Sequence, residues 1–165
     1  MNYTVESLQR LHQKSTAGFK STKKFLAKLS KLNPRKLDTI VHQHHAEEFL
    51  KINCLDCANC CKTLSPAIFD NDIRRMSKSL KLTPSVFTLQ YLVPDTDGSY
   101  ILKNIPCIFL DSDNFCKIYN DRPKACREYP HTDRKRVVRI LNLTAQNSKV
   151  CPAVFNIIDK LKKDV

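Results

Sequence analysis

The chain has 165 residues and a mass of 19.0 kDa, which is enough to enclose one hydrophobic core. It carries a formal net charge of +12, and its eight cysteines stand beside only two glycines and no tryptophan. It contains no Gly-rich phosphate loop and no G-x-S-x-G motif, which argues against Rossmann domains, P-loop NTPases and α/β-hydrolases.

The first fifty residues predict amphipathic helices. Apolar residues recur every three to four positions over residues 8–32, with a loosening expected around 16–22. Asn33 followed by Pro34 is a typical helix start, because asparagine caps a helix and proline fits its first turn. We expect the helix that begins there to run to about Leu50.

Most of the positive charge lies at the start of the chain. Residues 1–36 contribute +8, whereas the remaining 129 residues contribute only +4. We therefore expect residues 1–49 to be a basic amphipathic helical extension that packs on the core, and residues 50–165 to be a cysteine-cluster metal-binding domain. Residues 1–36 can alternatively bind nucleic acid or an acidic protein, although no recognised nucleic-acid module is present.

Two short helices are expected after the first cysteines. Asp70 or Asp72 can cap the first of them, and Thr83-Pro84 repeats the cap-plus-proline signal and opens the second, which extends through Leu92.

The middle of the chain carries its only hairpin signal. A turn is expected at 94–98, and a second turn at 111–114 lies among short β-prone segments. These segments are 99–103, 106–110 and 115–119.

The last part of the chain returns to helical patterns. Residues 123–129 predict one or two helical turns, residues 134–145 predict a helix, and Cys151-Pro152 starts a last helix with one apolar face. The expected fold class is therefore mainly α with a small β-hairpin, an irregular α+β fold. We expect its cysteine-rich core to be stabilised by metal.

Four cysteines fall within eight residues and give the strongest chemical signal. A C-x-x-C turn aims two sulfurs at one centre about 2.3 Å away, and a third cysteine three residues later can reach the same centre. This cluster is Cys54, Cys57, Cys60 and Cys61. The side chains of the adjacent Cys60 and Cys61 diverge, so these two residues can serve two different centres.

The cysteine spacing leaves two kinds of centre open. Zinc ribbons usually join two C-x-x-C knuckles, and this chain has no second knuckle outside the first cluster. Iron–sulfur proteins use C-x2-C-x2-C with a remote cysteine followed by proline, a scheme that Cys151-Pro152 can complete. We therefore favour an iron–sulfur cluster as the cofactor, with zinc as the alternative.

The order of the cysteines also resembles a known family. After the first cluster come Cys107, then C-K-I-Y-x-x-R-P-x-x-C-R-x-Y-P over residues 116–130, and then Cys151-Pro152. This order is similar to the bacterial cysteine-cluster (CxxCxxCC) family of zinc- or iron-chelating, or iron–sulfur-cluster-containing, proteins, over about residues 50–160. The resemblance implies metal binding by all eight cysteines: Cys54, Cys57, Cys60, Cys61, Cys107, Cys116, Cys126 and Cys151.

Other polar residues near the cysteines have simpler explanations. Arg122 and Arg127 can reach a carboxylate or a thiolate; we expect Arg122 to brace its loop and leave Arg127 open. His42 and His45, one helical turn apart, can chelate metal, but an exposed polar helix face produces such a pair easily. No base is evident beside Cys60 or Cys61, so no catalytic constellation is recognised.

The sequence also suggests a compartment. A secretory signal needs an uninterrupted apolar stretch of about 7 to 15 residues, which the first 36 residues lack. The best candidate for a membrane span, 105–110, is far shorter than the roughly 18 residues required. We expect a soluble, cytoplasmic protein whose thiols stay reduced.

Overall fold

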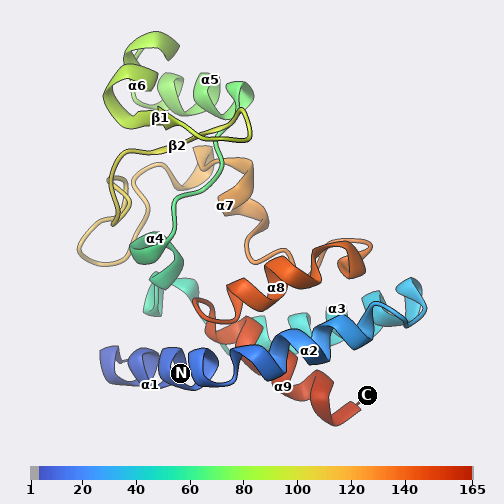
Figure 1. The fold of residues 1–165 in the computed structure, drawn as a ribbon. Coiled ribbons are helices and arrows are strands. Elements are labelled where there is room, and N and C mark those ends of the chain that lie inside the picture. Colours follow the sequence, from blue (N-terminus) through green and yellow to red (C-terminus); the bar gives the residue numbers. More distant parts are fainter. Residues whose placement is uncertain (1–3, 165) are drawn as a thin grey trace. The chain divides into compact units, whose positions relative to one another are not determined.

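The computed structural model describes residues 4–164 of the chain. Within them it has nine α-helices and one two-stranded antiparallel sheet (Figure 1), which confirms the expected mainly helical α+β class. Two compact units divide the chain. The terminal unit is the described part of Met1–Cys57 and Pro130–Val165, and the central unit is Ala58–Tyr129. The predicted domain boundary between residues 49 and 50 stays a prediction.

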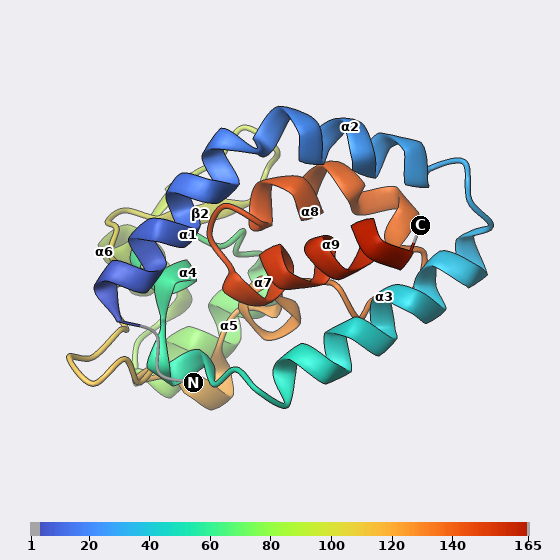
Figure 2. The same cartoon turned by 90° about the horizontal axis from the view of Figure 1, so that it is seen from below.

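The terminal unit is built of helices. Figure 2 shows α8 and α9 lying between α2 and α3. The unit contains α1 (Val5–Ala17), α2 (Phe19–Leu29), α3 (Pro34–Phe49), the short 3-10 helices η1 (Cys54–Asp56) and η3 (Val137–Ile140), α8 (Leu141–Asn147) and α9 (Pro152–Asp164).

Local signals explain where the first helices begin and end. The expected loosening is confirmed as a break at Gly18, which separates α1 from α2. The Asn33 side chain accepts hydrogen bonds from the backbone N–H groups of Arg35 and Lys36, and Pro34 occupies the first turn of α3, as the sequence predicts.

An apolar core joins these helices. Its buried residues come from α2, α3, η3, α8 and α9, and the expected apolar face of the last helix is part of it. They are Leu26, Leu29, Leu37, Val41, Val137, Leu141, Ala145, Val154, Ile157, Ile158 and Leu161. The terminal unit therefore has an ordinary hydrophobic interior, and additional stabilisation by metal stays a prediction.

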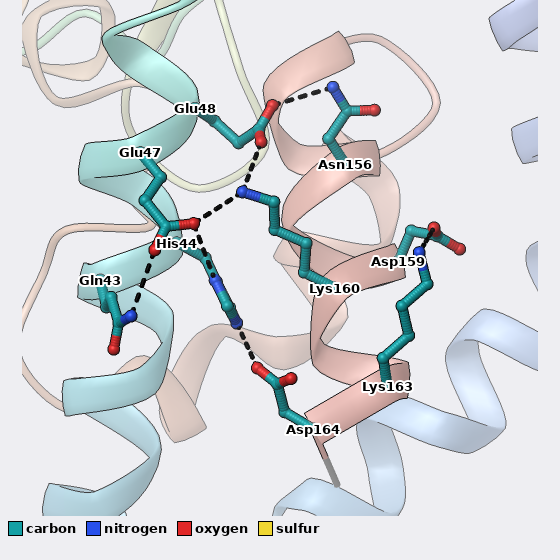
Figure 3. Close-up of polar contacts among 9 residues, drawn as sticks. All are labelled: Gln43, His44, Glu47, Glu48, Asn156, Asp159, Lys160, Lys163 and Asp164. Carbon is teal, nitrogen blue, oxygen red and sulfur yellow. Dashed lines mark hydrogen bonds and ion pairs between the residues drawn. The ribbon is translucent and has the colours of Figure 1, made fainter.

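A polar network runs along the α3–α9 contact (Figure 3). Lys160 Nζ lies 2.7 Å from Glu47 Oε2 and 2.7 Å from Glu48 Oε1. Asn156 Nδ2 donates to Glu48 Oε2 at 2.9 Å, and His44 Nε2 lies 2.6 Å from an Asp164 oxygen. These contacts fix the register of α9 against α3.

The central unit is smaller and less regular. It contains α4 (Asn59–Thr63), α5 (Asp70–Ser79), α6 (Pro84–Tyr91), β1 (Leu92–Pro94), β2 (Tyr100–Leu102), the 3-10 helix η2 (Tyr119–Asp121) and α7 (Lys124–Glu128). Its buried core residues are Ile68, Ile73, Met76, Phe87, Leu92, Leu102, Phe109 and Ile118. Cys107 and Cys116 pack against this core from the side.

The helices expected in this unit are confirmed, with one difference at the start of α5. The Thr83 side chain accepts the backbone N–H of Val86 at the start of α6. Phe69, rather than Asp70 or Asp72, holds the N-cap position of α5. The Asp72 carboxylate reaches back to the backbone N–H of Phe69 at 3.3 Å, so it still supports the helix start.

The hairpin differs from the prediction. The β-prone segment at 99–103 does contain a strand, but its partner is β1, which follows α6 directly, with Leu92 opposite Leu102. The segments 106–110 and 115–119 are joined only by an isolated antiparallel bridge between Leu110 and Cys116. The turn at 94–98 therefore connects the true hairpin.

The helix predicted over 134–145 is wrong in its first part. Arg136 has a φ of 58° and lies in the left-handed region, so no helix passes through it. The Asp38 carboxylate accepts the backbone N–H groups of Arg136 and Val137 at 2.7 and 2.9 Å and holds this bend. Helical structure begins only at Val137.

Among residues 4–164, no helix combines the length and apolar character that crossing a membrane requires.

Candidate metal centre

The first cysteine cluster lies on a sharp bend rather than on one helix. Cys54 opens η1, and the Cys57 backbone N–H donates to the Cys54 carbonyl at 3.2 Å. Ala58 follows with a φ of 45°, in the left-handed region that favours glycine. The chain then enters α4, which carries Cys60 and Cys61. The bend therefore divides the cluster into two pairs.

In the terminal unit, Cys151 interacts electrostatically with the first pair. It precedes α9, and burial raises the pKa of its thiol to about 12. Negative charge on Cys54 or Cys57 would raise this pKa further, so the three sulfurs lie within electrostatic range of one another. The sequence predicts all three as ligands but does not indicate that Cys151 belongs with this pair rather than with Cys60 and Cys61.

In the central unit, four cysteines from four segments gather. The Cys107 backbone N–H donates to the Cys61 carbonyl at 2.9 Å, which ties these two segments together. Cys116 lies opposite Leu110 in the isolated bridge, on the segment that returns after the turn at 111–114. Cys126 lies in α7, where its backbone N–H donates to the Pro123 carbonyl at 3.0 Å.

These four thiols influence one another's ionisation. Burial raises the pKa of Cys126 to about 12, and charge on Cys61, Cys107 or Cys116 would raise it further. Burial also raises the pKa values of Cys107 and Cys116. Such mutual influence requires that the four sulfurs lie within electrostatic range.

Cys61 differs from the other three thiols. Its Sγ lies 4.0 Å from Cys60 Sγ, and a hydrogen bond between these thiols lowers the pKa of Cys61 to about 7. Positive charges on Arg122 and Lys62 also lower the pKa of Cys61. Cys61 is therefore the member of the group that ionises most readily.

Backbone N–H groups point at three of the buried sulfurs. Phe109 and Leu110 hydrogen-bond to the Cys107 thiolate, and Ile118 does the same for Cys116. At the start of α9, the N–H groups of Ala153 and Val154 hydrogen-bond to the Cys151 thiolate. Such bonds stabilise the ionised sulfur, which is the form that binds metal.

A buried ion pair braces the segment that carries Cys126. Asp72 Oδ1 accepts Arg75 Nη2 at 2.6 Å and the Lys124 backbone N–H at 2.9 Å. Arg75 Nη2 also donates to the Arg122 carbonyl at 2.7 Å. Sequence reasoning assigns Asp72 only a capping role and does not single out Arg75, because this contact joins segments about fifty residues apart.

The two arginines of the R-P-x-x-C-R motif have different surroundings. Arg127 Nη1 donates to the Arg122 carbonyl at 3.1 Å, so Arg127 braces the loop. The Arg122 guanidinium lies over the Tyr119 ring, with Cζ 3.6 Å from the ring centroid.

The histidines contact a loop of the terminal unit. His42 Nε2 lies 2.9 Å from the Arg134 carbonyl oxygen, and His45 Nδ1 lies 2.7 Å from Thr132 Oγ1. Burial lowers the pKa of His45, which favours its neutral form. Over residues 4–164, no three Cys, His, Asp or Glu side chains are gathered closely enough to hold a metal ion as they stand.

The donor chemistry fits a metal bound by thiolates. Two groups of sulfurs lie within electrostatic range, and backbone N–H groups point at sulfurs in both groups. No curated protein and no solved structure matches the chain. A family model matches residues 53–152, which span the first cysteine pair, the central unit and Cys151, and the chain therefore belongs to the CxxCxxCC family, described as "Putative zinc- or iron-chelating domain".

Proposed function

We propose that this protein binds metal in two thiolate centres, one in each unit. The central centre uses Cys61, Cys107, Cys116 and Cys126, and the terminal centre uses Cys54, Cys57 and Cys151. Cys60, beside Cys61, remains the eighth candidate ligand. The observation that carries the proposal is the mutual electrostatic influence of four thiols that come from four separate segments of the central unit.

We further propose that the centres are iron–sulfur clusters with a structural or electron-transfer role. The cysteines outside the first cluster are single, which suits a cluster held by remote cysteines better than a zinc ribbon built from paired knuckles. The backbone N–H groups that reach Cys107, Cys116 and Cys151 support the same choice, because hydrogen bonds to sulfur tune the potential of such clusters. Zinc remains the alternative metal.

The identity of the metal can be tested on the full chain purified without oxygen. Iron–sulfur clusters predict broad absorption near 400 nm, together with iron and acid-labile sulfide. A colourless protein with stoichiometric zinc would replace the iron–sulfur assignment by the zinc alternative. A folded protein that binds neither iron nor zinc would overturn metal binding itself.

A second candidate function is a zinc-stabilised module that docks nucleic acid or an acidic partner through its basic helices. The observation that favours it is the surface of α2, whose four lysines are all exposed and lie opposite its buried Leu26 and Leu29. The chain has no acidic residue between Glu6 and Asp38. These lysines are Lys20, Lys23, Lys24 and Lys28.

The second candidate predicts salt-dependent binding to RNA, because lysines release counterions from phosphates. Changing the four α2 lysines to glutamine should weaken this binding strongly. A matched variant that loses four exposed lysines of the central unit should bind RNA like the unaltered protein; these are Lys62, Lys78, Lys81 and Lys103. Equal loss in both variants would indicate a general charge effect and exclude α2 as the docking surface.

A further inference from the structure

The guanidinium of Arg122 lies in an unusual position. It stacks over the Tyr119 ring at 3.6 Å, the arrangement of a cation–π contact. Its Nε is buried and has no hydrogen-bond partner in the described part of the chain. A buried N–H without a partner costs free energy, so a group that accepts this N–H would stabilise the arrangement.

The backbone of Arg122 is fixed from two sides. Its carbonyl accepts Arg75 Nη2 at 2.7 Å and Arg127 Nη1 at 3.1 Å. Arg75 is itself held by the Asp72 carboxylate. Because backbone and ring platform are both fixed, the direction of the Arg122 side chain is set before any ligand arrives.

The positive charge of Arg122 acts on sulfurs from three segments. It lowers the pKa values of Cys61, Cys116 and Cys126, although burial has the larger, opposite effect on Cys116 and Cys126. Four thiolates around one divalent ion leave a net negative charge in a partly buried place, which is unfavourable without a nearby cation. Arg122 lies within electrostatic range of these sulfurs.

We propose that Arg122 is the charge partner of the central thiolate centre: its guanidinium, held over Tyr119, donates Nε–H to a ligand sulfur and offsets the negative charge of the bound metal. This inference rests on the metal binding proposed for Cys61, Cys107, Cys116 and Cys126. It makes Arg122 a residue that positions and tunes the centre without binding the metal.

The test measures Co²⁺ binding to the full chain, because cobalt bound by thiolates has a strong sulfur-to-metal charge-transfer band. Cys151→Ser is the background for every variant, so that the central centre dominates the signal. Arg122→Gln should bind Co²⁺ ten- to a hundredfold more weakly in competition with a chelator, as is typical when a hydrogen bond to a metal ligand is removed. The band maximum should also move, because the sulfur loses a donor.

Two further variants keep the test decisive. Arg122→Lys retains the charge without the planar Nε–H group, so it should lie between Arg122→Gln and the background protein in affinity. Arg74→Gln removes an exposed arginine of α5 and should change affinity by less than about twofold. If Arg122→Gln does not fold, Arg122→Lys carries the comparison.

The outcomes separate this inference from the proposed function. If Cys126→Ser binds Co²⁺ as tightly as the background protein, the central centre itself is wrong. If Cys126→Ser loses binding but the Arg122 variants bind normally, only the role of Arg122 is wrong. If the Arg122 variants bind more weakly with an unmoved band, Arg122 serves the loop structure alone and the inference is also overturned.

Discussion

Replacing Asp72 by asparagine tests the brace beneath the central cysteines. The Asp72 carboxylate is 3% exposed and accepts hydrogen bonds from the Arg75 guanidinium and from the backbone N–H groups of Lys124 and Phe69. Asparagine has nearly the same shape but carries no charge. It can keep a neutral hydrogen bond through Oδ1, but it leaves Arg75 without its ionic partner.

The expected cost follows from these contacts. A hydrogen bond to a charged group contributes about 1.5 to 3 kcal/mol, and breaking a fully buried ion pair costs about 3 to 5 kcal/mol. The Arg75 side chain is 28% exposed, so water replaces part of the lost interaction. We therefore expect Asp72→Asn to lower the free energy of unfolding by about 2 to 3 kcal/mol at pH 7.

The same substitution has a defined dependence on pH. Burial raises the pKa of Asp72, but the hydrogen bonds from Arg75, Lys124 and Phe69 lower it further, so the folded-state pKa lies below its ordinary value. A carboxylate with a lowered pKa stabilises the fold above its unfolded pKa of about 3.9, and this stabilisation is lost as the pH falls through the folded pKa. The difference between the two proteins should therefore be constant above about pH 5 and shrink at lower pH.

Urea unfolding followed by circular dichroism, at several pH values between 7 and 3, measures this difference. Asp70→Asn is the matched control, because Asp70 is an exposed acid in the same helical turn, and it should cost less than about 1 kcal/mol. Equal stability of Asp72→Asn and the unaltered protein at pH 7, or a difference that persists unchanged at pH 3, would refute the brace.

Three further predictions concern the terminal unit. Ile157→Ala should lower the free energy of unfolding by about 2 to 5 kcal/mol in urea, because it leaves a cavity in the core. Asn33→Ala should lower the thermal midpoint through loss of the α3 cap, a cost of about 1 kcal/mol. Glu48→Gln should lower the thermal midpoint at pH 7; burial raises the pKa of Glu48, but hydrogen bonds from Lys160 and Asn156 lower it further, so the difference should fade as the pH falls through this lowered value.

Each of these predictions has a matched control. Leu143→Ala removes a side chain that is 42% exposed and should change stability much less than Ile157→Ala; an equal effect would contradict the assigned core. Asn142→Ala, at an exposed helical position, should leave the thermal midpoint nearly unchanged. Glu6→Gln breaks an exposed pair and should show no such pH-dependent loss, and a Glu48→Gln protein as stable as the unaltered one would contradict the network in Figure 3.

Helix starts could be predicted from the sequence because their signals are local. Asn33 and Thr83 act through hydrogen bonds to residues two or three positions later, so the pattern contains the whole interaction. The bend at Arg136 could not be predicted in this way, because the Asp38 side chain that holds it is about a hundred residues away in the chain. The hairpin was misplaced because Pro94 reads as a turn residue, although it lies at the end of an edge strand.

The candidate site shows the same limit. Spacing alone identifies the cysteines as candidate ligands and indicates that Cys60 and Cys61 can serve different centres. Spacing does not indicate that Cys151 interacts with Cys54 and Cys57, because this grouping depends on how α9 folds back onto the terminal unit. The role proposed for Arg122 depends on its contact with Tyr119 and on the orientation of its guanidinium, which no sequence pattern specifies.

Metal analysis of single cysteine variants tests the two-centre arrangement most directly. The full chain, Cys126→Ser and Cys151→Ser would be purified without oxygen, and metal per chain would be measured in each. We predict that each variant loses the metal of its own unit and keeps that of the other, and that the double variant loses nearly all of it. Full metal content in both single variants would contradict the account.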